Sequence, residues 1–288
     1  MIVMRLKCGL GNQMFQYASG LGIARATKQA LIIDDVTGFA GEDSGRTYGL
    51  DIFNILAKKA SPCDLPVKIF FHNRLNEITN NLFRKKPKIF VQRMRAFDAA
   101  VFSLRDVYMI GFWQSEKYFK AIEDVVRSEL SFKAVPDGRN VDMARRIASC
   151  GSVSLHVRRG DYVSNPYASR LFGGIPVGYY HEAVRALVSK AVGRPELFVF
   201  SDDIQWAREN LSFEYPCTFV EHNDASKSYE DMRLMSLCKH NIIANSSFSW
   251  WGAWLNRNPG KIVIAPKSWY KAPDARNPDI IPDAWLQL

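Results

Sequence analysis

The stretch "VSLHVRRGDYV", residues 153–163, contains the features that decide the fold of the C-terminal half. Its first five residues form a short apolar, β-branched run that is typical of a buried strand. Similar runs recur at residues 197–201, 218–221, 241–245 and 261–265, and segments with helical spacing lie between them (176–191, 203–210 and 228–240). Alternating strands and helices predict a parallel, doubly wound α/β sheet.

Polar residues follow each of the first four predicted strands. In a parallel sheet the carboxyl ends of the strands share one edge, and ligands bind in the crevice outside that edge. The residues in these places are, strand by strand, His156, Arg158 and Asp161; Ser201, Asp202 and Asp203; Glu221 and His222; Asn245, Ser246 and Ser247. This edge is therefore the expected ligand site.

Two adjacent arginines at a strand end suggest an anionic ligand. The guanidinium group presents a planar fork of donors that suits phosphate oxygens. Because neighbouring residues on a strand point in different directions, we expect Arg158 to face the ligand, and Arg159 to pair with an acid such as Asp161 or to brace the site. The alternative is a structural salt bridge. His156 is either a satisfied core histidine or a second ligand contact.

The run "NIIANSSFSWWGAWL" (241–255) places small hydroxyl residues at a strand-to-helix junction. Ser246 and Ser247 there either hold phosphate oxygens at the helix N-terminus or simply cap it. Asp231 lies on the preceding predicted helix, where its carboxylate could accept hydrogen bonds from a guanine edge, unless it is an ordinary surface residue. A nucleoside diphosphate held without a metal is the ligand that these residues suggest, although "SDD" (201–203) is ambiguous as a metal motif.

The N-terminal half also begins as an α/β unit. A short strand, a turn with Gly9 and Gly11, a helix over about 12–28 and a second strand ending in Asp34 and Asp35 are predicted. The glycine pattern alone indicates a plain tight turn, whereas the amides Asn12 and Gln13 at the helix start point to a ligand contact. A strand followed by an amphipathic helix is predicted over 107–130, and two lobes are expected, 1–148 and 149–288.

Composition fits a protein of two domains. The 288 residues are 47% hydrophobic, and no apolar run approaches the ~20 residues of a membrane span. The net charge is +9, of which residues 1–150 carry +8, and much of it lies in "RKKPKIFVQRMR" (84–95). This stretch is a solvated face or a contact with anionic lipid; nucleic acid has only the charge in its favour. Five scattered cysteines and no export signal predict a cytoplasmic protein.

Several blocks resemble the bacterial α-1,2-fucosyltransferases of glycosyltransferase family 11. They are "GLGNQMFQYASGLGIA", "GFWQSEKYF", "HVRRGDYV", "FSDD", "DMRLMSLCKHNIIANSSFSWWGAWLN" and "APKSWY". The resemblance covers nearly the whole chain and is weakest over 56–100. It implies a GT-B fold with two Rossmann-like lobes facing a central cleft, and inverting transfer of L-fucose from GDP-β-L-fucose to the 2-OH of a terminal galactoside without a cofactor or required metal.

The resemblance also implies roles for individual residues. Arg158 would contact the β-phosphate, His156 the nucleotide, and Asp231 the guanine, with Asn12 and Gln13 reaching in from the acceptor lobe. Other implied donor-site residues are Gly11, Arg159, Asp202, Asn245, Ser246, Ser247 and Phe248. Arg158, Asn12 and Asp161 are the expected catalytic residues, and Asp161 is either the general base or an orienting partner of the arginines.

Three alternatives remain at this point. An α-1,6-fucosyltransferase would share the motifs in looser form. A nicotinamide-dependent enzyme would use Asp34 or Asp35 as its ribose-binding acid, although the third glycine of the dinucleotide fingerprint is missing. A non-catalytic sugar- or nucleic-acid-binding module would explain the charge and the tryptophans, but not the arginines and serines at the strand ends.

Overall fold

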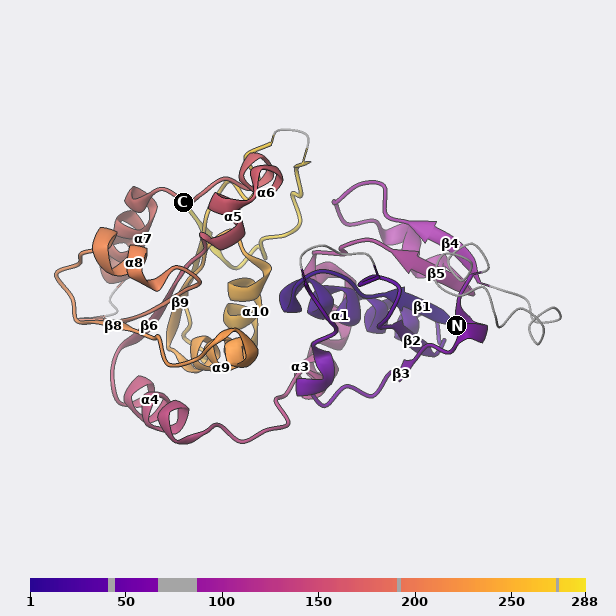
Figure 1. Ribbon diagram of the computed structural model, residues 1–288, viewed down its shortest axis with the longest axis horizontal. Coiled ribbons are helices and arrows are strands. Elements are labelled where there is room, and N and C mark those ends of the chain that lie inside the picture. Colours follow the sequence, from indigo (N-terminus) through magenta and orange to yellow (C-terminus); the bar gives the residue numbers. More distant parts are fainter. Residues whose placement is uncertain (41–44, 67–86, 191–192, 273–274) are drawn as a thin grey trace. The chain divides into compact units, whose positions relative to one another are not determined.

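The computed structural model describes residues 1–40, 45–66, 87–190, 193–272 and 275–288, and it contains two compact units (Figure 1). The N-terminal unit comprises Met1–Lys133 together with Asn277–Ile280, and the C-terminal unit comprises Ala134–Arg276 together with Ile281–Leu288. Each unit has its own sheet, and all the paired strands of both sheets run parallel. The predicted α/β class and the two lobes are confirmed.

The sheet of the N-terminal unit has the strand order β3-β2-β1-β5-β4. Its strands are β1 (Ile2–Arg5), β2 (Leu31–Asp34), β3 (Lys58–Lys59), β4 (Lys88–Val91) and β5 (Val107–Ile110). The central strand β1 is apolar and buried because both of its neighbours and the helix that follows it cover it. The edge strand β4 is exposed instead, and its apolar Ile89 and Val91 face solvent.

Helix α1 (Leu10–Ala26) follows β1 and is buried over most of its length. It begins two residues earlier than the sequence indicated. Further along the chain, short 3₁₀ turns replace parts of the predicted connections: η1 (Leu50–Ile52), η2 (Pro62–Asp64) and η4 (Ala99–Ser103).

The amphipathic helix predicted after β5 is only partly helical. The chain forms the 3₁₀ turns η5 (Glu116–Tyr118) and η6 (Lys120–Ile122) before α3 (Glu123–Glu129) begins. Phe119 interrupts the helix because its backbone is not helical (φ −130°, ψ 6°). The predicted apolar stripe consists of Phe119, Ile122, Val126 and Leu130. It packs largely inward, since Phe119, Val126 and Leu130 are buried and Ile122 is half-buried.

The sheet of the C-terminal unit has the strand order β11-β10-β9-β6-β7-β8. Its strands are β6 (Ser152–Val157), β7 (Glu196–Ser201), β8 (Cys217–Phe219), β9 (His240–Ile242), β10 (Val263–Ala265) and β11 (Leu286–Gln287). Numbered from β6, this is the order 3-2-1-4-5-6 of a dinucleotide-binding fold. The five predicted strands are all present, with ends that differ by at most three residues.

Helices cover both faces of this sheet. The helical segments of this unit are α4 (Gly138–Ser149), α5 (Gly160–Ser164), α6 (Pro166–Leu171), α7 (Val177–Ser189), α8 (Ile204–Asn210), η7 (Ala225–Lys227), α9 (Ser228–Leu237) and α10 (Ser247–Leu255). Val153, Leu155 and Val157 of β6 pack with α7 into one core cluster. Phe198 and Phe200 of β7 pack on the opposite face with residues of α4 and α9. The strands are apolar on both faces, as a covered parallel sheet requires.

The two units divide between Lys133 and Ala134, whereas the sequence analysis placed the boundary at 148/149. The helical pattern of residues 138–149 does not reveal which sheet the helix covers. In the structure Ile147 of α4 packs into the core of the C-terminal unit. Residues Asn277–Ile280 return to the N-terminal unit, where Asn277 donates to the carbonyl of Gln114 (2.9 Å).

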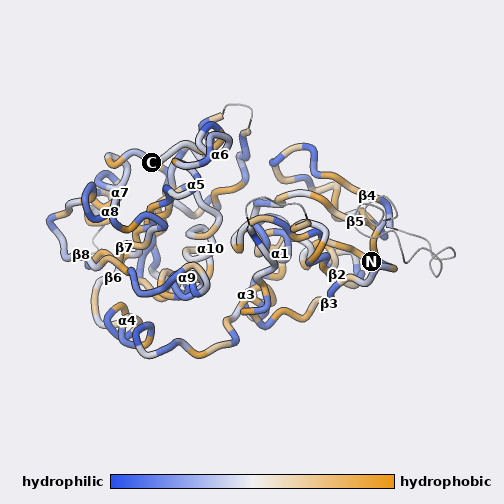
Figure 2. The backbone as a smooth tube through the Cα atoms, viewed as in Figure 1, coloured by the Kyte–Doolittle hydropathy of each residue, from blue (hydrophilic) through white to orange (hydrophobic). Residues whose placement is uncertain are grey.

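Figure 2 shows α4 as largely hydrophilic, which fits a helix that covers a sheet only with its inner face. None of the helices within the described ranges is long and apolar enough to cross a membrane. All five cysteines lie in the described ranges, and all five are free thiols.

Candidate active site

The centre of the C-terminal sheet is its topological switch point. Strand β6 lies between β7 and β9, and the chain leaves β6 in one direction along the sheet and returns on the other side. Open α/β sheets bind ligands at the carboxyl ends of the strands at such a point. Arg158 and Arg159 directly follow β6, and Asn245 and Ser246 precede α10 after β9.

Arg158 lies at this point and forms two ion pairs. Its Nη2 is 2.5 Å from Asp161 Oδ1, and its Nη1 is 2.7 Å from Asp202 Oδ2. The guanidinium also lies 5.4 Å from the ring centroid of Tyr162. The two carboxylates come from different strand ends, so they fix the fork in one orientation. About a fifth of the side chain stays accessible.

Arg159 points to different partners, as the alternation along the strand end predicts. Its Nε is 3.0 Å from Asp203 Oδ2, and its guanidinium lies over the ring of Trp206 at 3.8 Å. Its backbone N–H donates to Asp202 (2.8 Å). Gly160 permits this arrangement, because a Cβ atom there would lie 2.3 Å from Asp202 Oδ2.

The structure decides between two pairings that the sequence left open. Asp161 was considered as a partner of either arginine, and in the structure it pairs with Arg158, whereas Asp203 holds Arg159. Asp203 also caps α8 by accepting from the N–H of Trp206 (3.2 Å). Two guanidiniums and three carboxylates thus form one connected cluster, and an anion that binds Arg158 must compete with Asp161 or Asp202.

His156 lies on β6 and is almost completely buried. Burial, followed by the nearby charge of Arg158, lowers the pKa of His156 to about 3, so the imidazole is neutral at physiological pH. Its Nδ1 is buried without a hydrogen-bond partner. A satisfied core histidine would have its ring nitrogens paired, so this one differs from that alternative.

The junction after β9 combines a helix N-terminus with a second unpaired polar atom. Ser246 caps α10 by accepting from the N–H of Phe248 (3.3 Å). Asn245 donates to the carbonyl groups of Phe172 and Trp269, but its Oδ1 is buried without a partner. Ser247 and Phe248 occupy the first turn and are half-buried. The ring of Phe248 lies 5.9 Å from that of His156, so the strand ends of β6 and β9 meet here.

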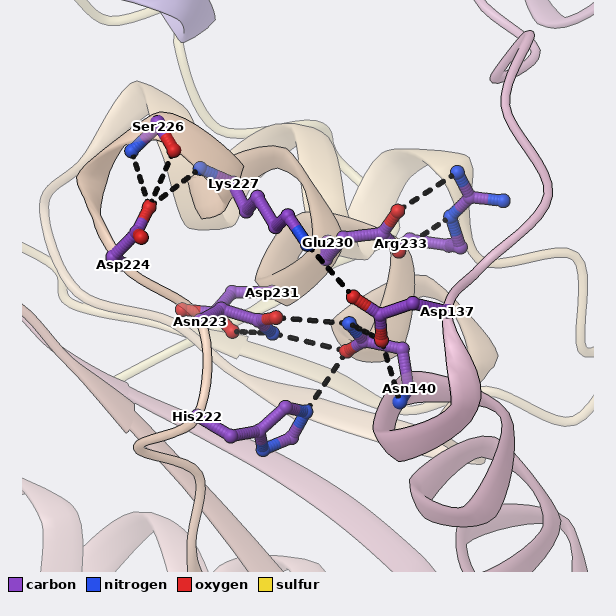
Figure 3. Close-up of polar contacts among 10 residues, drawn as sticks. All are labelled: Asp137, Asn140, His222, Asn223, Asp224, Ser226, Lys227, Glu230, Asp231 and Arg233. Atoms are coloured by element: carbon purple, nitrogen blue, oxygen red, sulfur yellow. Dashed lines mark hydrogen bonds and ion pairs between the residues drawn. The ribbon is translucent and has the colours of Figure 1, made fainter.

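Asp231 on α9 belongs to a separate polar network, which Figure 3 shows. Asn223 donates to Asp231 Oδ1 (2.7 Å) and to Asn140 Oδ1 (3.0 Å), and it accepts from Asn140 Nδ2 (2.9 Å). His222 Nε2 lies 3.0 Å from the same Asn140 Oδ1. Asn140 is fully buried and donates to Asp137 (2.9 Å), which in turn pairs with Lys227 (3.0 Å). Asn140 is therefore the hub of the network.

This network leaves Asp231 as an unusual carboxyl group. Burial raises its pKa to about 7, the hydrogen bond from Asn223 lowers it, and the neighbouring Glu230 raises it. Glu230 itself is held by Arg233 (2.9 Å), which also donates to the carbonyl of Ala134. A carboxylate that is partly desolvated and fixed through one oxygen is suited to accept hydrogen bonds from a ligand with its other oxygen.

The residues of the N-terminal unit that were expected to bind the donor form hydrogen bonds within their own unit. Gln13 is buried; it donates to the carbonyls of Cys8 (2.8 Å) and Thr47 (2.9 Å) and accepts from the N–H of Gly49 (2.9 Å). Gly11 is buried in the first turn of α1. Asn12 is half-buried, and its Oδ1 accepts from Gln114 of the segment after β5 (2.8 Å). Of these three residues, Asn12 alone is not fully buried.

The acids of the nicotinamide alternative are also used locally. Asp34 is buried and accepts from the N–H groups of Val36 (3.1 Å) and Thr37 (2.9 Å) and from the hydroxyls of Thr37 and Tyr108. Asp35 pairs with Lys59 (3.0 Å). A ribose would have to displace these partners, so the structure disfavours a dinucleotide at this strand end.

Within the described ranges, no three or more His, Cys, Asp or Glu side chains gather as metal ligands would. The basic stretch 84–95 is described only from residue 87 onward, so Arg84, Lys85 and Lys86 lie outside the described residues.

Sequence reasoning did not select several residues that organise these sites. Tyr162 donates to the carbonyl of Asn245 (2.9 Å) and so joins α5 to the end of β9. Asn140 and Asn223 hold Asp231 across α4, a loop and α9. Asp137 with Asn140 three residues later is a helix-start pattern that could have located the N-terminus of α4, but not its partner.

Comparison with known proteins gives the family. The model of glycosyl transferase family 11 matches residues 52–288. An alpha-1,2-colitosyltransferase of Escherichia coli is 34% identical over all of this chain and 98% of its own length. The O-antigen biosynthesis glycosyltransferase WbnK of Escherichia coli is 30% identical over 98% of this chain and 99% of its own. A galactoside 2-alpha-L-fucosyltransferase of Caenorhabditis elegans is 24% identical over 91% of this chain and 71% of its own.

Solved structures support the fold at low sequence identity. A mutant of Arabidopsis thaliana FUT1 in complex with GDP has a TM-score of 0.51 at 13% identity, over 98% of this chain and 74% of that one. The NodZ alpha-1,6-fucosyltransferase soaked with GDP-fucose has a TM-score of 0.50 at 15% identity, over 88% and 91%. These neighbours are GT-B fucosyltransferases, and the chain shares their fold. From its motifs, its fold and its full-length relatives, the chain belongs to glycosyltransferase family 11.

Proposed function

We propose that the protein transfers L-fucose from GDP-β-L-fucose to the 2-OH of a terminal galactoside, with inversion and formation of an α-1,2 linkage. Family membership and the α-1,2 relatives support the reaction class. The observation that carries the donor site is the switch point of the C-terminal sheet. Arg158, His156 and Asn245 lie there at the ends of the neighbouring strands β6 and β9, and His156 Nδ1 and Asn245 Oδ1 are buried without partners. A buried polar atom without a partner requires an explanation, and a bound ligand or water is one of them.

In this proposal each element of the donor has a place. The diphosphate binds at Arg158 and the N-terminus of α10, where the guanidinium and the helix dipole offset its charge without a metal or another cofactor. His156 and Asn245 contact the nucleotide or the sugar through their unpaired atoms. Asp231 accepts from the N–H groups of guanine, which adenine does not offer in the same pattern.

The chemistry follows from the charge that develops. The bond between fucose C1 and the β-phosphate oxygen breaks, and its electron pair leaves with GDP. Arg158 stabilises the negative charge that grows on that phosphate. The acceptor oxygen bonds to C1 from the opposite face, and its proton passes to a base. Because Asp161 already pairs with Arg158, we assign Asp161 to orienting that arginine, and Asn12 remains a candidate contact of the acceptor.

The experiment incubates the protein with GDP-fucose and lactose and analyses the products by NMR. We expect GDP and a trisaccharide with fucose α-linked at galactose O2. GDP-fucose binding without any transfer to galactosides would contradict the proposed acceptor, and a β-linked product would contradict inversion.

Colitosyl transfer is a second candidate, since the relative named for it is 34% identical over the full chain, compared with 24% for the galactoside fucosyltransferase. Colitose is fucose without its 3-hydroxyl. A site that hydrogen-bonds this hydroxyl discriminates strongly against the analogue that lacks it, whereas an apolar site discriminates little. Competition between GDP-fucose and GDP-colitose at equal concentration therefore identifies the preferred donor by product ratio.

We also propose that the protein works in the cytoplasm, attached to an anionic membrane surface through residues 84–95. The described part supports this with the exposed Lys88. Each basic residue near such a surface contributes roughly 1 kcal/mol. In vesicle flotation the wild type should rise with anionic vesicles at low salt, and a variant with Lys85, Lys86 and Lys88 changed to Gln should not. Equal flotation with neutral vesicles would exclude the proposal.

A further inference from the structure

The N-terminal unit contains a cavity of about 590 Å³ that the donor site does not use. Its lining includes Phe90, Gln92, Arg93, Phe97, Asp98 and Trp113. We propose that this cavity is a carbohydrate subsite that receives the terminal sugar ring of the acceptor. The proposal rests on the glycosyltransferase function proposed above, and it adds the residues that recognise the acceptor.

The cavity has the position of a ligand site in an α/β unit. Gln92 directly follows the carboxyl end of β4, and Trp113 follows that of β5, which pairs with β4 in parallel. Phe97 and Asp98 belong to the segment that connects the two strands and close another side. Ligands bind outside the carboxyl ends of strands in this fold class, and a volume of several hundred Å³ is ordinary for a small-molecule site.

Aromatic rings form part of the lining. The rings of Phe90 and Trp113 are stacked with centroids 6.1 Å apart and an interplanar angle of 29°. Phe97 packs at 4.8 Å against Tyr118, which holds it in place. The face of an aromatic ring is electron-rich and attracts the positively polarised C–H groups of a sugar ring. Flat aromatic walls therefore suit a pyranose better than a flexible acyl chain.

Polar groups of the lining lack partners. Gln92 Oε1 accepts from the N–H groups of Phe112 (2.9 Å) and Trp113 (3.0 Å), but Gln92 Nε2 has no partner. Trp113 Nε1 is also unpartnered. Arg93 has no ion-pair partner among the residues that the structure describes. Asp98 Oδ1 caps the turn of η4, and the carboxylate adds acceptors to this wall. Donors and acceptors around aromatic rings match a ligand rich in hydroxyls.

The backbone around these groups adopts an energetically unfavourable conformation. Trp113 has a positive φ of 55°, a conformation that a residue with a bulky side chain rarely adopts. Gly111 lets the two strand ends approach, because a Cβ atom there would lie 2.6 Å from Gln92 Cβ. Unfavourable backbone conformations persist where the surroundings enforce them, and they cluster at ligand sites. The conformation places the indole of Trp113 against Phe90 and on the cavity wall.

The first test reads binding directly. The seven tryptophans of the chain are labelled with ¹⁵N, and the indole signal of Trp113 is assigned from its loss in Trp113→Phe. Lactose is then added to the full-length wild type, with maltose as the control sugar. We expect the Trp113 signal to move with lactose in a saturable manner, and to move less with maltose. A Trp113 signal that lactose leaves in place contradicts the proposal.

The second test uses turnover. Phe90→Leu keeps an apolar side chain but removes the ring, and Arg93→Ala removes the guanidinium. Each should raise the KM for lactose by about fivefold or more, which is the effect of losing one aromatic or hydrogen-bonded contact. The slow release of GDP from GDP-fucose without acceptor should stay at the wild-type rate. Arg105→Ala, an exposed arginine of the same unit outside the cavity, is the matched control.

The outcomes separate this proposal from the proposed function. If Phe90→Leu and Arg93→Ala keep the wild-type KM for lactose and the wild-type thermal unfolding, the proposed acceptor subsite is wrong. The proposed fucosyl transfer is unaffected by that result. A wild type that transfers no sugar but shows the saturable Trp113 shift overturns the function and keeps the carbohydrate site. If the variants lose GDP-fucose binding as well as lactose binding, they are misfolded and their kinetics do not test the subsite. The NMR titration of the wild type then decides.

Discussion

The turns that follow β1 and β2 of the N-terminal sheet use their polar residues differently from the turns that follow β6 and β9 of the C-terminal sheet. After β1 and β2 of the N-terminal unit, the side chains of Gln13 and Asp34 form hydrogen bonds with nearby backbone and hydroxyl groups. These bonds use the polar atoms of both side chains. After β6 and β9 of the C-terminal unit, His156 and Asn245 are equally buried but keep one polar atom each without a partner.

The contrast shows that a polar side chain at a strand-to-helix turn is an ambiguous signal. Amides such as Gln13 stabilise a loop by bonding to its backbone, because buried backbone groups need partners. Unpaired buried atoms next to a charged cluster have no such task in the fold. The polar residues of the N-terminal turns thus stabilise the fold, whereas in our proposal the unpaired atoms at the C-terminal edge contact the donor.

The largest expected effect is at Arg158. Changing Arg158→Lys replaces a fork that reaches Asp161 and Asp202 with a single ammonium group, so both the orientation and the bidentate contact are lost. We expect kcat to fall by at least about a hundredfold, the size seen when a donor to a developing negative charge is removed. Arg145→Lys on the exposed face of α4 is the control and should behave as wild type. Comparable rates for both variants would refute the role of Arg158.

The pH dependence of donor affinity tests the network of Figure 3. The pKa of Asp231 is raised to about 7, so the acid is protonated below that pH and cannot accept from both guanine N–H groups. The KM for GDP-fucose should rise about tenfold per pH unit below 7, until the pKa in the complex is reached. GDP-fucose is the suitable ligand because the terminal phosphate of GDP itself titrates near pH 6. Asp231→Asn should bind weakly with no such slope, and an equal slope in that variant would assign the titration to another group.

A smaller effect is expected from Asn140→Ala. Asn140 does not touch the donor in our proposal; it positions Asn223, which holds Asp231. We expect the KM for GDP-fucose to rise by about threefold to tenfold, which is the net value of one or two buried hydrogen bonds, with kcat nearly unchanged. Preference for GDP-fucose over an ADP-sugar should also decline. A loss of kcat without a change in KM would show that Asn140 has only a structural role.

This comparison predicts that substitutions of Gln13 and Ser246 have opposite effects: the first lowers stability and spares donor binding, and the second mainly weakens donor binding. Gln13→Ala removes three buried hydrogen bonds and should lower the free energy of unfolding by about 2 to 4 kcal/mol, while the folded protein binds GDP-fucose normally. Ser246→Ala removes a helix cap worth about 1 kcal/mol and should weaken GDP-fucose binding. Urea unfolding and calorimetry measure both quantities. Weaker donor binding in Gln13→Ala than in Ser246→Ala would undo the distinction between the two edges.

The smallest expected effect is that of metal removal. Because Arg158 and the N-terminus of α10 offset the diphosphate charge in our proposal, excess EDTA should leave at least about half of the activity. If EDTA abolished the activity and Mg²⁺ or Mn²⁺ restored it, the diphosphate would instead bind a metal ion held by Asp202 or Asp203.

Much of the fold was predictable because the strands of a covered parallel sheet are short apolar runs. "VSLHV" and "LFVFS" correspond to β6 and β7 almost residue for residue. The helix predicted after β5 was less accurate, since periodicity reports which side chains face the core but not whether the backbone stays helical at Phe119. The opposite directions of Arg158 and Arg159 were also predictable, because neighbouring residues at a strand end alternate.

The sequence by itself determined the α/β class, the residues at the strand ends and the family, because these depend on local periodicity and on short contiguous motifs. Only the tertiary structure decided the partners. In the structure Asp161 pairs with Arg158, Asp203 pairs with Arg159, and α4 belongs to the C-terminal unit. Partners of this kind are joined across distant segments, as Asn140 is to Asn223, and a hydrogen bond depends on distance and direction in space, which neighbouring residues in the sequence do not encode.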